Sequence, residues 1–416
     1  MKFFLKGSLA LSFIFFHTQP ILAAWKSQSS GVTTDLNAVY FQDSETGWTV
    51  GSQGVILKTT NGGSTWSSQT SGTTTALRDV HFINSSTGLV VGSDGVILKS
   101  SDTGTTWSAV TSGISNILYS VYWVNLSTAW AAGELGRIRK SQDGGASWSN
   151  GALNGSTSND LRAIFFINTS TGWAVGNSGT ILKTMDGGEN WNAQTSGTTE
   201  NLRSLFFISV STGWVAGANG VIRKSTDSGS TWSSLISTTT NFNALHFIST
   251  TTGWVVGNSG IVVKSSDSGR NFESEKSSTT NQLNDVFFST EPVGYAVGAS
   301  GTIIKNSTAS TTETAASDST PQGSLKAINN LFDPSKAELT TIEYSILNQG
   351  NVVIRIYNMQ GRKIKTLVNE AKNASTNYSI TWDGKNEDGE IVGSGIYFVH
   401  IEGPNFSKTQ KIAVVQ

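Results

Sequence analysis

Short apolar runs recur along residues 25–305 at a nearly constant spacing. Each run starts with a large apolar residue and ends in an aromatic one. The starting residues are Leu36, Leu77, Leu118, Leu161, Leu202, Phe242 and Leu283, and the successive spacings are 41, 41, 43, 41, 40 and 41 residues. A fixed period of this length is typical of repeat architectures, in which each repeat is one supersecondary unit. We therefore interpret residues 25–305 as seven copies of one β-rich unit.

Each copy contains the pattern of several short strands. The second strand reads Gly-aromatic-x-x-Gly, as in Gly172-Trp173 to Gly176, and a tight turn then leads to a third strand such as residues 55–58. Abundant Gly, Ser and Thr, with few helix formers, agree with short strands joined by turns. Four strands in about 41 residues make one propeller blade. The sequence thus predicts an all-β fold whose main body is a seven-bladed β-propeller.

A Ser/Thr-x-Asp-x-Gly-x-x-Trp motif, the Asp box, closes six of the seven copies. Its Asx residues are Asn61, Asp102, Asp143, Asp186, Asp227 and Asp267. An Asx side chain in such a turn accepts backbone N–H groups, and the aromatic residue packs between sheets. We interpret these boxes as structural motifs and not as catalytic ones.

The two ends of the repeat region complement each other. The seventh copy stops after Lys305 without an Asp box, whereas residues 25–31 (WKSQSSG) match residues 66–72 (WSSQTSG) of the first copy. We therefore predict that a strand starting at Trp25 completes the seventh blade. Closure of this kind removes a sheet edge that would otherwise be open to aggregation.

The repeated sequence pattern, clearest between Phe166 and Trp191, closely resembles that of the photosystem II stability/assembly factor-like propellers. The resemblance covers residues 25–305. Plant and cyanobacterial members of that family are assembly factors that bind a membrane-protein client. The resemblance therefore implies a propeller that binds a partner, but it does not identify that partner.

A different pattern follows a Ser/Thr-rich stretch, residues 306–326, which we interpret as a linker. Alternating apolar residues at 341–346 and 353–357, a Trp-Asp-Gly turn at 382–384 and the segment 395–398 predict a small antiparallel sandwich over residues 327–416. This sequence pattern resembles that of the immunoglobulin-like module of flagellar hook-capping proteins and of the type IX secretion C-terminal sorting domains. The resemblance implies a domain for export or attachment at the cell surface.

The first 24 residues have the three parts of a secretory signal: a basic start, the apolar run 9–16 and small residues at 21–24. We expect cleavage near Ala24, no membrane span in the mature chain, and a secreted or surface-displayed protein.

The chain has no cysteine and a net charge of −1. No nucleic-acid-binding stripe or cofactor motif occurs, so we expect no nucleic-acid partner and no cofactor. We expect a monomer.

One ring of positions suggests a binding surface. The residue after each copy's starting residue lies at the same end of the innermost strand, and the seven are Asn37, Arg78, Tyr119, Arg162, Arg203, Asn243 and Asn284. The planar guanidinium of arginine donates paired hydrogen bonds to carboxylates, and it also binds polar protein surfaces. We single out Arg78, Tyr119, Arg162 and Arg203 as candidate binding residues for a protein partner at the cell envelope or outside the cell. The alternative is that these side chains only solvate the rim and pack on neighbouring blades.

A carbohydrate-binding or glycoside-hydrolysing propeller is the competing interpretation. Asp94 and Glu134 are the only acids in the seven turns between second and third strands, and they would lie on the same face as the arginines. Two opposed carboxylates are what glycoside hydrolysis requires. The repeats are too uniform to form a substrate cleft, so we favour a protein that is not an enzyme. His81 and His246 occupy one inner-strand position that is otherwise aromatic, where packing is expected instead of metal binding.

Overall fold

The computed structural model describes residues 25–151, 157–236, 238–290, 293–306, 324–328, 331–346, 348–358, 362–404 and 406–415. They form two compact units, divided between Thr312 and Glu313. Within these ranges, every regular element is a β-strand or a short 3-10 turn. The signal segment predicted for residues 1–24 lies outside the described residues.

Seven four-stranded sheets make up the first unit, and in six of them the strands run from inner to outer in chain order. Blades 1 to 3 are β2 (Leu36–Phe41), β3 (Gly47–Gly51), β4 (Ile56–Thr59), β5 (Ser67–Gln69); β6 (Leu77–Phe82), β7 (Gly88–Gly92), β8 (Ile97–Ser100), β9 (Ser108–Val110); and β10 (Leu118–Trp123), β11 (Ala129–Gly133), β12 (Ile138–Ser141), β13 (Ser149–Asn150). Blades 4 to 6 are β14 (Leu161–Phe166), β15 (Gly172–Gly176), β16 (Ile181–Thr184), β17 (Asn192–Gln194); β18 (Leu202–Phe207), β19 (Gly213–Gly217), β20 (Ile222–Ser225), β21 (Ser233–Ser234); and β22 (Phe242–Phe247), β23 (Gly253–Gly257), β24 (Val262–Ser265), β25 (Glu273–Glu275).

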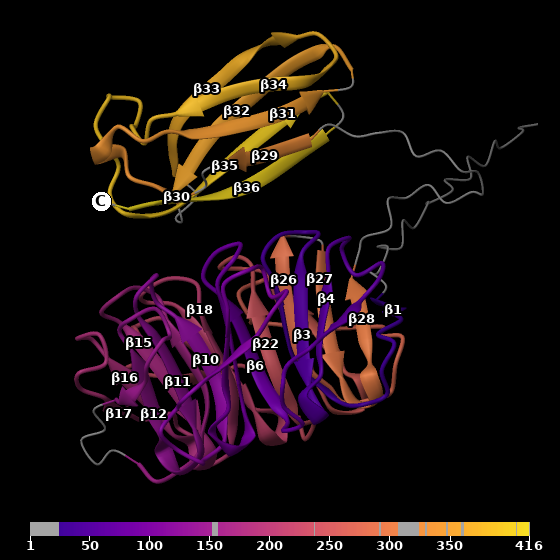
Figure 1. Cartoon of the computed structure of the whole chain (residues 1–416), viewed down its shortest axis with the longest axis vertical. Helices are drawn as coiled ribbons and strands as arrows, with labels where there is room; N and C mark the ends of the chain where they lie inside the picture. The colour runs from indigo at the N-terminus through magenta and orange to yellow at the C-terminus, as the bar shows by residue number, and fades with distance from the viewer. Residues whose placement is uncertain are drawn as a thin grey trace, which may run out of the picture. The chain divides into compact units, whose positions relative to one another are not determined.

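Blade 7 is built from both ends of the repeat region. It consists of β26 (Leu283–Thr290), β27 (Val293–Gly298), β28 (Ile303–Asn306) and β1 (Trp25–Gln28). Figure 1 shows β1 beside β28. The two strands pair in antiparallel fashion, with Trp25 opposite Asn306. The predicted seven-bladed propeller closed by the N-terminal strand is thereby confirmed.

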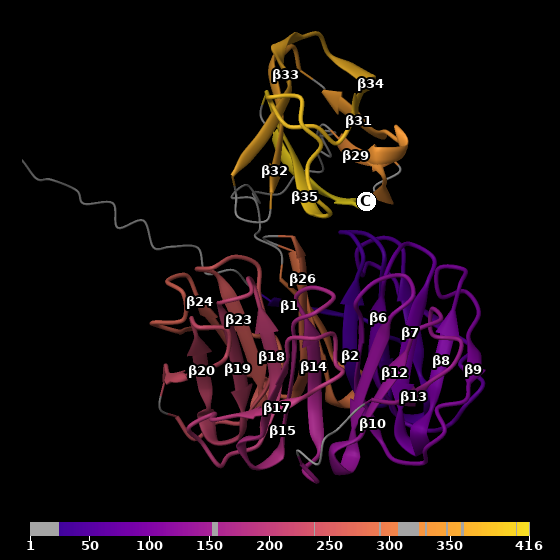
Figure 2. The ribbon, with the colours of Figure 1, turned by 90° about the vertical axis from the view of Figure 1, so that its left-hand side faces the viewer.

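The strand register assigns each loop to one of two faces. In blade 1, Leu36 at the start of β2 pairs with Gly51 at the end of β3, next to the turn η1 (Ser52–Gly54). Equivalent turns are η2 (Ser93–Gly95), η3 (Glu134–Gly136), η4 (Asn177–Gly179), η5 (Ala218–Gly220), η6 (Asn258–Gly260) and η7 (Ala299–Gly301). We call this end the mouth face and the opposite end, where the Asp boxes lie, the Asp-box face. Figure 2 shows the strands running between the two faces.

Aromatic stacking joins successive blades. Trp173 of β15 lies flat against Phe207 of the next blade, with ring centroids 3.5 Å apart. The same stack recurs between other pairs, and between blades 7 and 1 it is made by Tyr295 and Phe41 at 3.7 Å. Glycine before the aromatic residue leaves room for the phenylalanine of its own blade, because a Cβ at Gly172 would lie 2.6 Å from the Phe166 ring. Packing of the aromatic side chains between blades therefore explains the Gly-aromatic motif.

The Asp boxes close turns and form joints between blades. Asp102 Oδ1 accepts the N–H groups of Thr105 and Thr106 at 3.1 and 2.9 Å, and Ser100 Oγ donates to the same oxygen at 2.8 Å. These hydrogen bonds lower the pKa of Asp102 to about 2. Backbone carbonyls of the box face the preceding blade, as where Trp173 Nε1 donates to Ser228 O at 3.1 Å. The box is thus a structural element in the described propeller.

Replacing Asp102 with Ala is expected to lower the melting temperature at neutral pH by roughly 2–4 °C, because two N–H groups of the turn lose their acceptor. Asp102→Asn should melt close to the wild type. Asn61 shows why, since its Oδ1 accepts the Thr65 N–H at 3.0 Å in the box of blade 1. Differential scanning calorimetry of the three proteins checks this. Equal melting of the Ala and Asn variants would contradict the structural role.

The second unit is a sandwich of two sheets with one core. One sheet has the order β29 (Ser324–Ile328), β31 (Thr340–Ile346), β34 (Ser375–Trp382), and the other has β30 (Leu331–Phe332), β36 (Phe406–Val414), β35 (Gly395–Gly403), β32 (Gly350–Asn358), β33 (Lys363–Lys372); η8 (Pro334–Lys336) follows β30. Trp382 is fully buried at its centre, with Phe332 and Tyr397 edge-on at 5.6 and 5.4 Å.

The limits of the linker differ from those predicted. We expected it to span residues 306–326, but Asn306 ends β28 and residues 324–326 already belong to β29. Leu325 and Ala327 pack against the sandwich core. Two small or medium apolar residues in a polar stretch are a weak strand signal, and they gain their strand by pairing with β31.

Candidate binding surface at the propeller mouth

The seven ring positions separate into two groups in the structure. The asparagines join neighbouring blades through their side-chain amides. Asn37 Nδ2 donates to Leu77 O at 2.6 Å, Asn243 Nδ2 to Leu283 O at 2.7 Å, and Asn284 Nδ2 to Leu36 O at 2.8 Å. The amide groups of these three residues therefore hold neighbouring blades together. The remaining four, Arg78, Tyr119, Arg162 and Arg203, belong to blades 2 to 5 and form the cationic arc of the mouth.

Arg78 differs from the other two arginines of the arc, because its guanidinium has no hydrogen-bonding partner among the described residues. Its Nε is buried without a hydrogen-bond acceptor, and no described residue accepts a hydrogen bond from its guanidinium. A buried donor without an acceptor costs free energy that a bound anion would recover. Arg78 is thus the group of the arc that is most available to a ligand.

Arg162 and Arg203 are already oriented by neighbours. Arg162 lies over the Tyr119 ring, with its guanidinium carbon 4.0 Å from the ring centroid, and its Nη2 forms an ion pair with Asp160 at 3.0 Å. Arg203 Nη1 donates to Asn243 Oδ1 at 2.6 Å. Burial, followed by the nearby charge of Arg162, lowers the pKa of Arg203. The arc is therefore a partly preorganised, positively charged surface that still has free N–H donors.

Beneath the mouth, two carboxylates and two serines cap the inner edges of the blades. Asp285 Oδ2 accepts the Val39 N–H of blade 1 at 2.9 Å, and its Oδ1 accepts the Val286 N–H at 2.8 Å. Asp79 accepts Val121 N–H and Val80 N–H at 2.8 Å each, while Ser120 and Ser204 accept from Ile164 and Leu245 at 3.3 and 3.1 Å. These side chains bond an N–H of the following blade from one shared position of the inner strand.

Burial raises the pKa of both carboxyl groups. The pKa of Asp79 rises to about 6 and that of Asp285 to about 7. Hydrogen bonds from backbone N–H groups lower both pKa values, but the effect of burial is larger. The negative charge of Asp79 raises the pKa of Asp285 further. Sequence reasoning did not find this pair. Its only signal was an Asp at a position that is Ala or Ser in the other five copies.

A belt of seven aromatic side chains lies deeper in the channel. It contains Tyr40, His81, Tyr122, Phe165, Phe206, His246 and Phe287, and the centroids of consecutive rings are 4.6–5.5 Å apart all the way round. His81 Nδ1 accepts the Trp123 N–H at 3.1 Å, and His246 Nδ1 accepts the Phe288 N–H at 2.8 Å. Burial lowers the pKa of His246 to about 4. Both histidines thus pack and accept hydrogen bonds within the belt.

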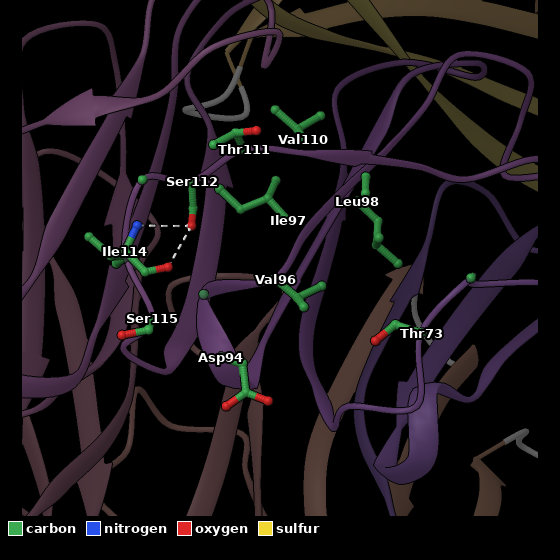
Figure 3. Close-up of a pocket in the computed structure, with 14 residues that line it drawn as sticks. Thr73, Asp94, Val96, Ile97, Leu98, Val110, Thr111, Ser112, Ile114 and Ser115 are labelled. Carbon is green, nitrogen blue, oxygen red and sulfur yellow. Dashed lines mark hydrogen bonds between the residues drawn. The ribbon is translucent and has the colours of Figure 1, made fainter.

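Asp94 and Glu134 both lie in mouth-face turns, but they do not line one pocket. Asp94 borders an open hollow of about 750 Å³, whose other walls come from residues 95–98 and 109–115 and from residues 72–73, which follow β5 of blade 1 (Figure 3). Glu134 is not part of that hollow; its Oε2 accepts from Asn116 and from the Ile117 N–H, both at 3.4 Å. The described residues contain no group of three or more acidic or histidine side chains that could hold a metal ion.

Comparisons with known proteins agree with this architecture. The model of the photosynthesis system II assembly factor YCF48 matches residues 18–116, 70–155, 110–185, 152–240 and 235–307. The chain belongs to the YCF48 family. A second model, the secretion system C-terminal sorting domain, matches residues 333–415 and points to export. No curated protein matches the chain. Among the described residues, no helix is long and apolar enough to span a membrane.

Solved structures show the same fold. YCF48 bound to D1 peptide is 20% identical, with a TM-score of 0.59, and the match covers 70% of this chain and 100% of that one. YCF48 from Cyanidioschyzon merolae is 19% identical, with a TM-score of 0.58 and coverage of 68% and 98%. The WD40 propeller domain of Doa1 is 12% identical, with a TM-score of 0.58 and coverage of 69% and 98%. The propeller and the sorting-domain resemblance predicted from the sequence are confirmed.

Proposed function

We propose that this protein is an exported, non-enzymatic scaffold whose mouth face binds a carboxylate-bearing segment of a protein partner. Arg78, Tyr119, Arg162 and Arg203 are its binding residues. The observation that carries the proposal is Arg78, whose guanidinium has no acceptor among the described residues although its Nε is buried. Arginine forks on a preorganised surface recognise carboxylates through charge-assisted hydrogen bonds.

Three further observations support this function. A YCF48 structure of the same fold contains a bound D1 peptide. The C-terminal unit matches a sorting domain, so the partner is expected at the cell envelope or outside the cell. Residues 1–24 have the composition of a cleaved secretory signal. We further propose that the mature protein acts as a monomer, with one binding mouth per chain.

The test is capture of partners from an envelope extract with the mature chain, followed by measured binding of the partner that is identified. A variant with Arg78, Arg162 and Arg203 all replaced by Ala is expected to bind about 100-fold more weakly, on the basis of about 1 kcal/mol for each of three charged hydrogen bonds lost. The wild-type affinity should also fall with rising salt. Isothermal titration calorimetry gives both results.

A matched control removes the same charge elsewhere. Lys26, Arg270 and Lys276 are exposed and lie outside the mouth ring, and their triple Ala variant should bind as the wild type does. A protein partner held equally well by both triple variants would refute the assignment to the mouth. Capture of a glycan instead, retained by both variants, would favour the carbohydrate interpretation.

A further inference from the structure

One turn of the mouth face differs from the other six. At the middle of η3, Leu135 has φ 53° and ψ 36°, in the left-handed region, and it is 57% exposed. A large side chain makes this conformation costly, whereas asparagine and aspartate tolerate it. The other six turns place polar residues there, namely Gln53, Asp94, Ser178, Asn219, Ser259 and Ser300. A strained and exposed apolar residue at this position points to a role other than folding.

Leu135 is connected to the cationic arc by one carboxylate. The Leu135 N–H donates to Asp160 Oδ1 at 3.1 Å, and Asp160 Oδ2 forms the ion pair with Arg162 Nη2 at 3.0 Å. Arg162 in turn lies over the Tyr119 ring. Each residue of an extended chain adds about 3.3 Å. A bound segment whose carboxylate contacts Arg162 therefore reaches Leu135 within a few residues.

The charges around Leu135 favour an acidic segment. Arg162 belongs to an inner strand, and Arg137, which is exposed, directly follows η3 at the start of the third strand of blade 3. The other six copies have an uncharged residue at the position of Arg137, namely Val55, Val96, Thr180, Val221, Ile261 and Thr302. Both nearby acids already have partners, because Asp160 pairs with Arg162 and Glu134 accepts hydrogen bonds from its own blade.

We propose that Leu135 is the apolar contact of the mouth surface, and that it selects segments in which an apolar residue stands two positions from the acidic residue bound by the arc. This inference rests on the proposed function, because the arc must first hold the carboxylate. In an extended segment, residues i and i+2 face the same side and lie about 7 Å apart. The acidic side chain then contacts Arg162, and the apolar one covers Leu135 and removes its surface from water.

The experiment is isothermal titration calorimetry of the mature chain with two hexapeptides, Gly-Gly-Asp-Gly-Leu-Gly and Gly-Gly-Asp-Gly-Ala-Gly. Both are acetylated and amidated, so that aspartate carries the only carboxylate. The leucine peptide is expected to bind about 10-fold more tightly than the alanine peptide. Leu135→Asn should still bind both peptides, with affinities within about twofold of each other. The variant without the three arginines should lose both.

Leu126→Asn is the matched control. Leu126 is 54% exposed in a loop on the Asp-box face of the same blade, and its replacement should preserve the 10-fold preference. Leu135→Asn itself should melt about 2 °C higher than the wild type, because Asn219 adopts the same turn conformation without a large apolar side chain. Differential scanning calorimetry measures this shift. Lower melting would mean that Leu135 serves the fold, and it would overturn the proposal.

The two levels of the argument fail in different ways. Equal affinity of the wild type for both peptides, lost in the triple-arginine variant, would overturn the apolar contact and leave the proposed function standing. A preference that persists in Leu135→Asn would overturn the apolar contact as well. Absence of binding by the wild type, or undiminished binding by the triple-arginine variant, would contradict the arc as a carboxylate site and so would overturn both.

Discussion

Tyr295→Ala is expected to reduce the free energy of unfolding of the propeller by about 3–5 kcal/mol, the usual cost of deleting a large buried aromatic side chain. Tyr295 is fully buried and stacks on Phe41 across the closure between blades 7 and 1. Its hydroxyl donates to Gly62 O at 2.8 Å. The loss therefore combines a cavity, a broken stack and a missing hydrogen bond at the point where the ring closes.

Two further variants test this explanation. Tyr295→Phe should cost only about 1 kcal/mol, because Lys305 Nζ still donates to Gly62 O at 2.7 Å. Tyr295→Trp should remain within about 1 kcal/mol of the wild type, since Trp fills the same position in five other blades. Denaturant unfolding by tryptophan fluorescence reports on the propeller, because only Trp382 of the 13 tryptophans lies outside it. A Phe variant as unstable as Ala would contradict the packing argument.

Asp285→Ser is expected to change how stability depends on pH. The folded pKa of Asp285 is about 7, well above its ordinary value of 3.8, so the folded state holds a proton that the unfolded state releases. Between these values the stability of the wild type falls as pH rises, and above pH 7 the loss is complete. Ser retains an acceptor for the Val39 N–H, as Ser120 does for Ile164, but cannot ionise.

The variant should therefore gain stability relative to the wild type between pH 4 and pH 8, by on the order of 2 kcal/mol once water in the channel is allowed for. Denaturant unfolding across this range measures the difference. The pKa of His246 is lowered to about 4, so its ionisation makes the stability rise with pH between about pH 4 and pH 6.5. Both proteins contain His246, and its contribution therefore drops out of the difference between them. The exposed residue Asp94, changed to Ser, is the control and should leave the profile unchanged. Parallel profiles for wild type and Asp285→Ser would refute the shift.

The repeat pattern made the fold predictable to the level of individual strands. Strand starts such as Leu36 and Leu283 coincide with β2 and β26, because each copy repeats the same alternation and the same turn residues. The likeness of residues 25–31 to 66–72 was sufficient to predict closure by β1. The linker was less predictable, since β29 depends on pairing with a strand that lies later in the chain.

The candidate surface was only partly predictable. Register placed all seven ring positions at one end of the inner strands, but the sequence did not distinguish the inter-blade bonds of Asn37 from the unpartnered guanidinium of Arg78. Asp285 was missed for a similar reason. Its partner, Val39, is 246 residues away and becomes a neighbour only when the ring closes.

The position of β28 has a mechanical consequence. The chain leaves the propeller at Asn306, and β28 is flanked by β27 on one side and by β1 on the other. Tension on the C-terminal unit, as on a protein held at a surface while its mouth holds a partner, would load β28 along its length. Both of its hydrogen-bonded ladders would then resist in shear together. Without β1 the same strand would form an edge that could peel away one bond at a time.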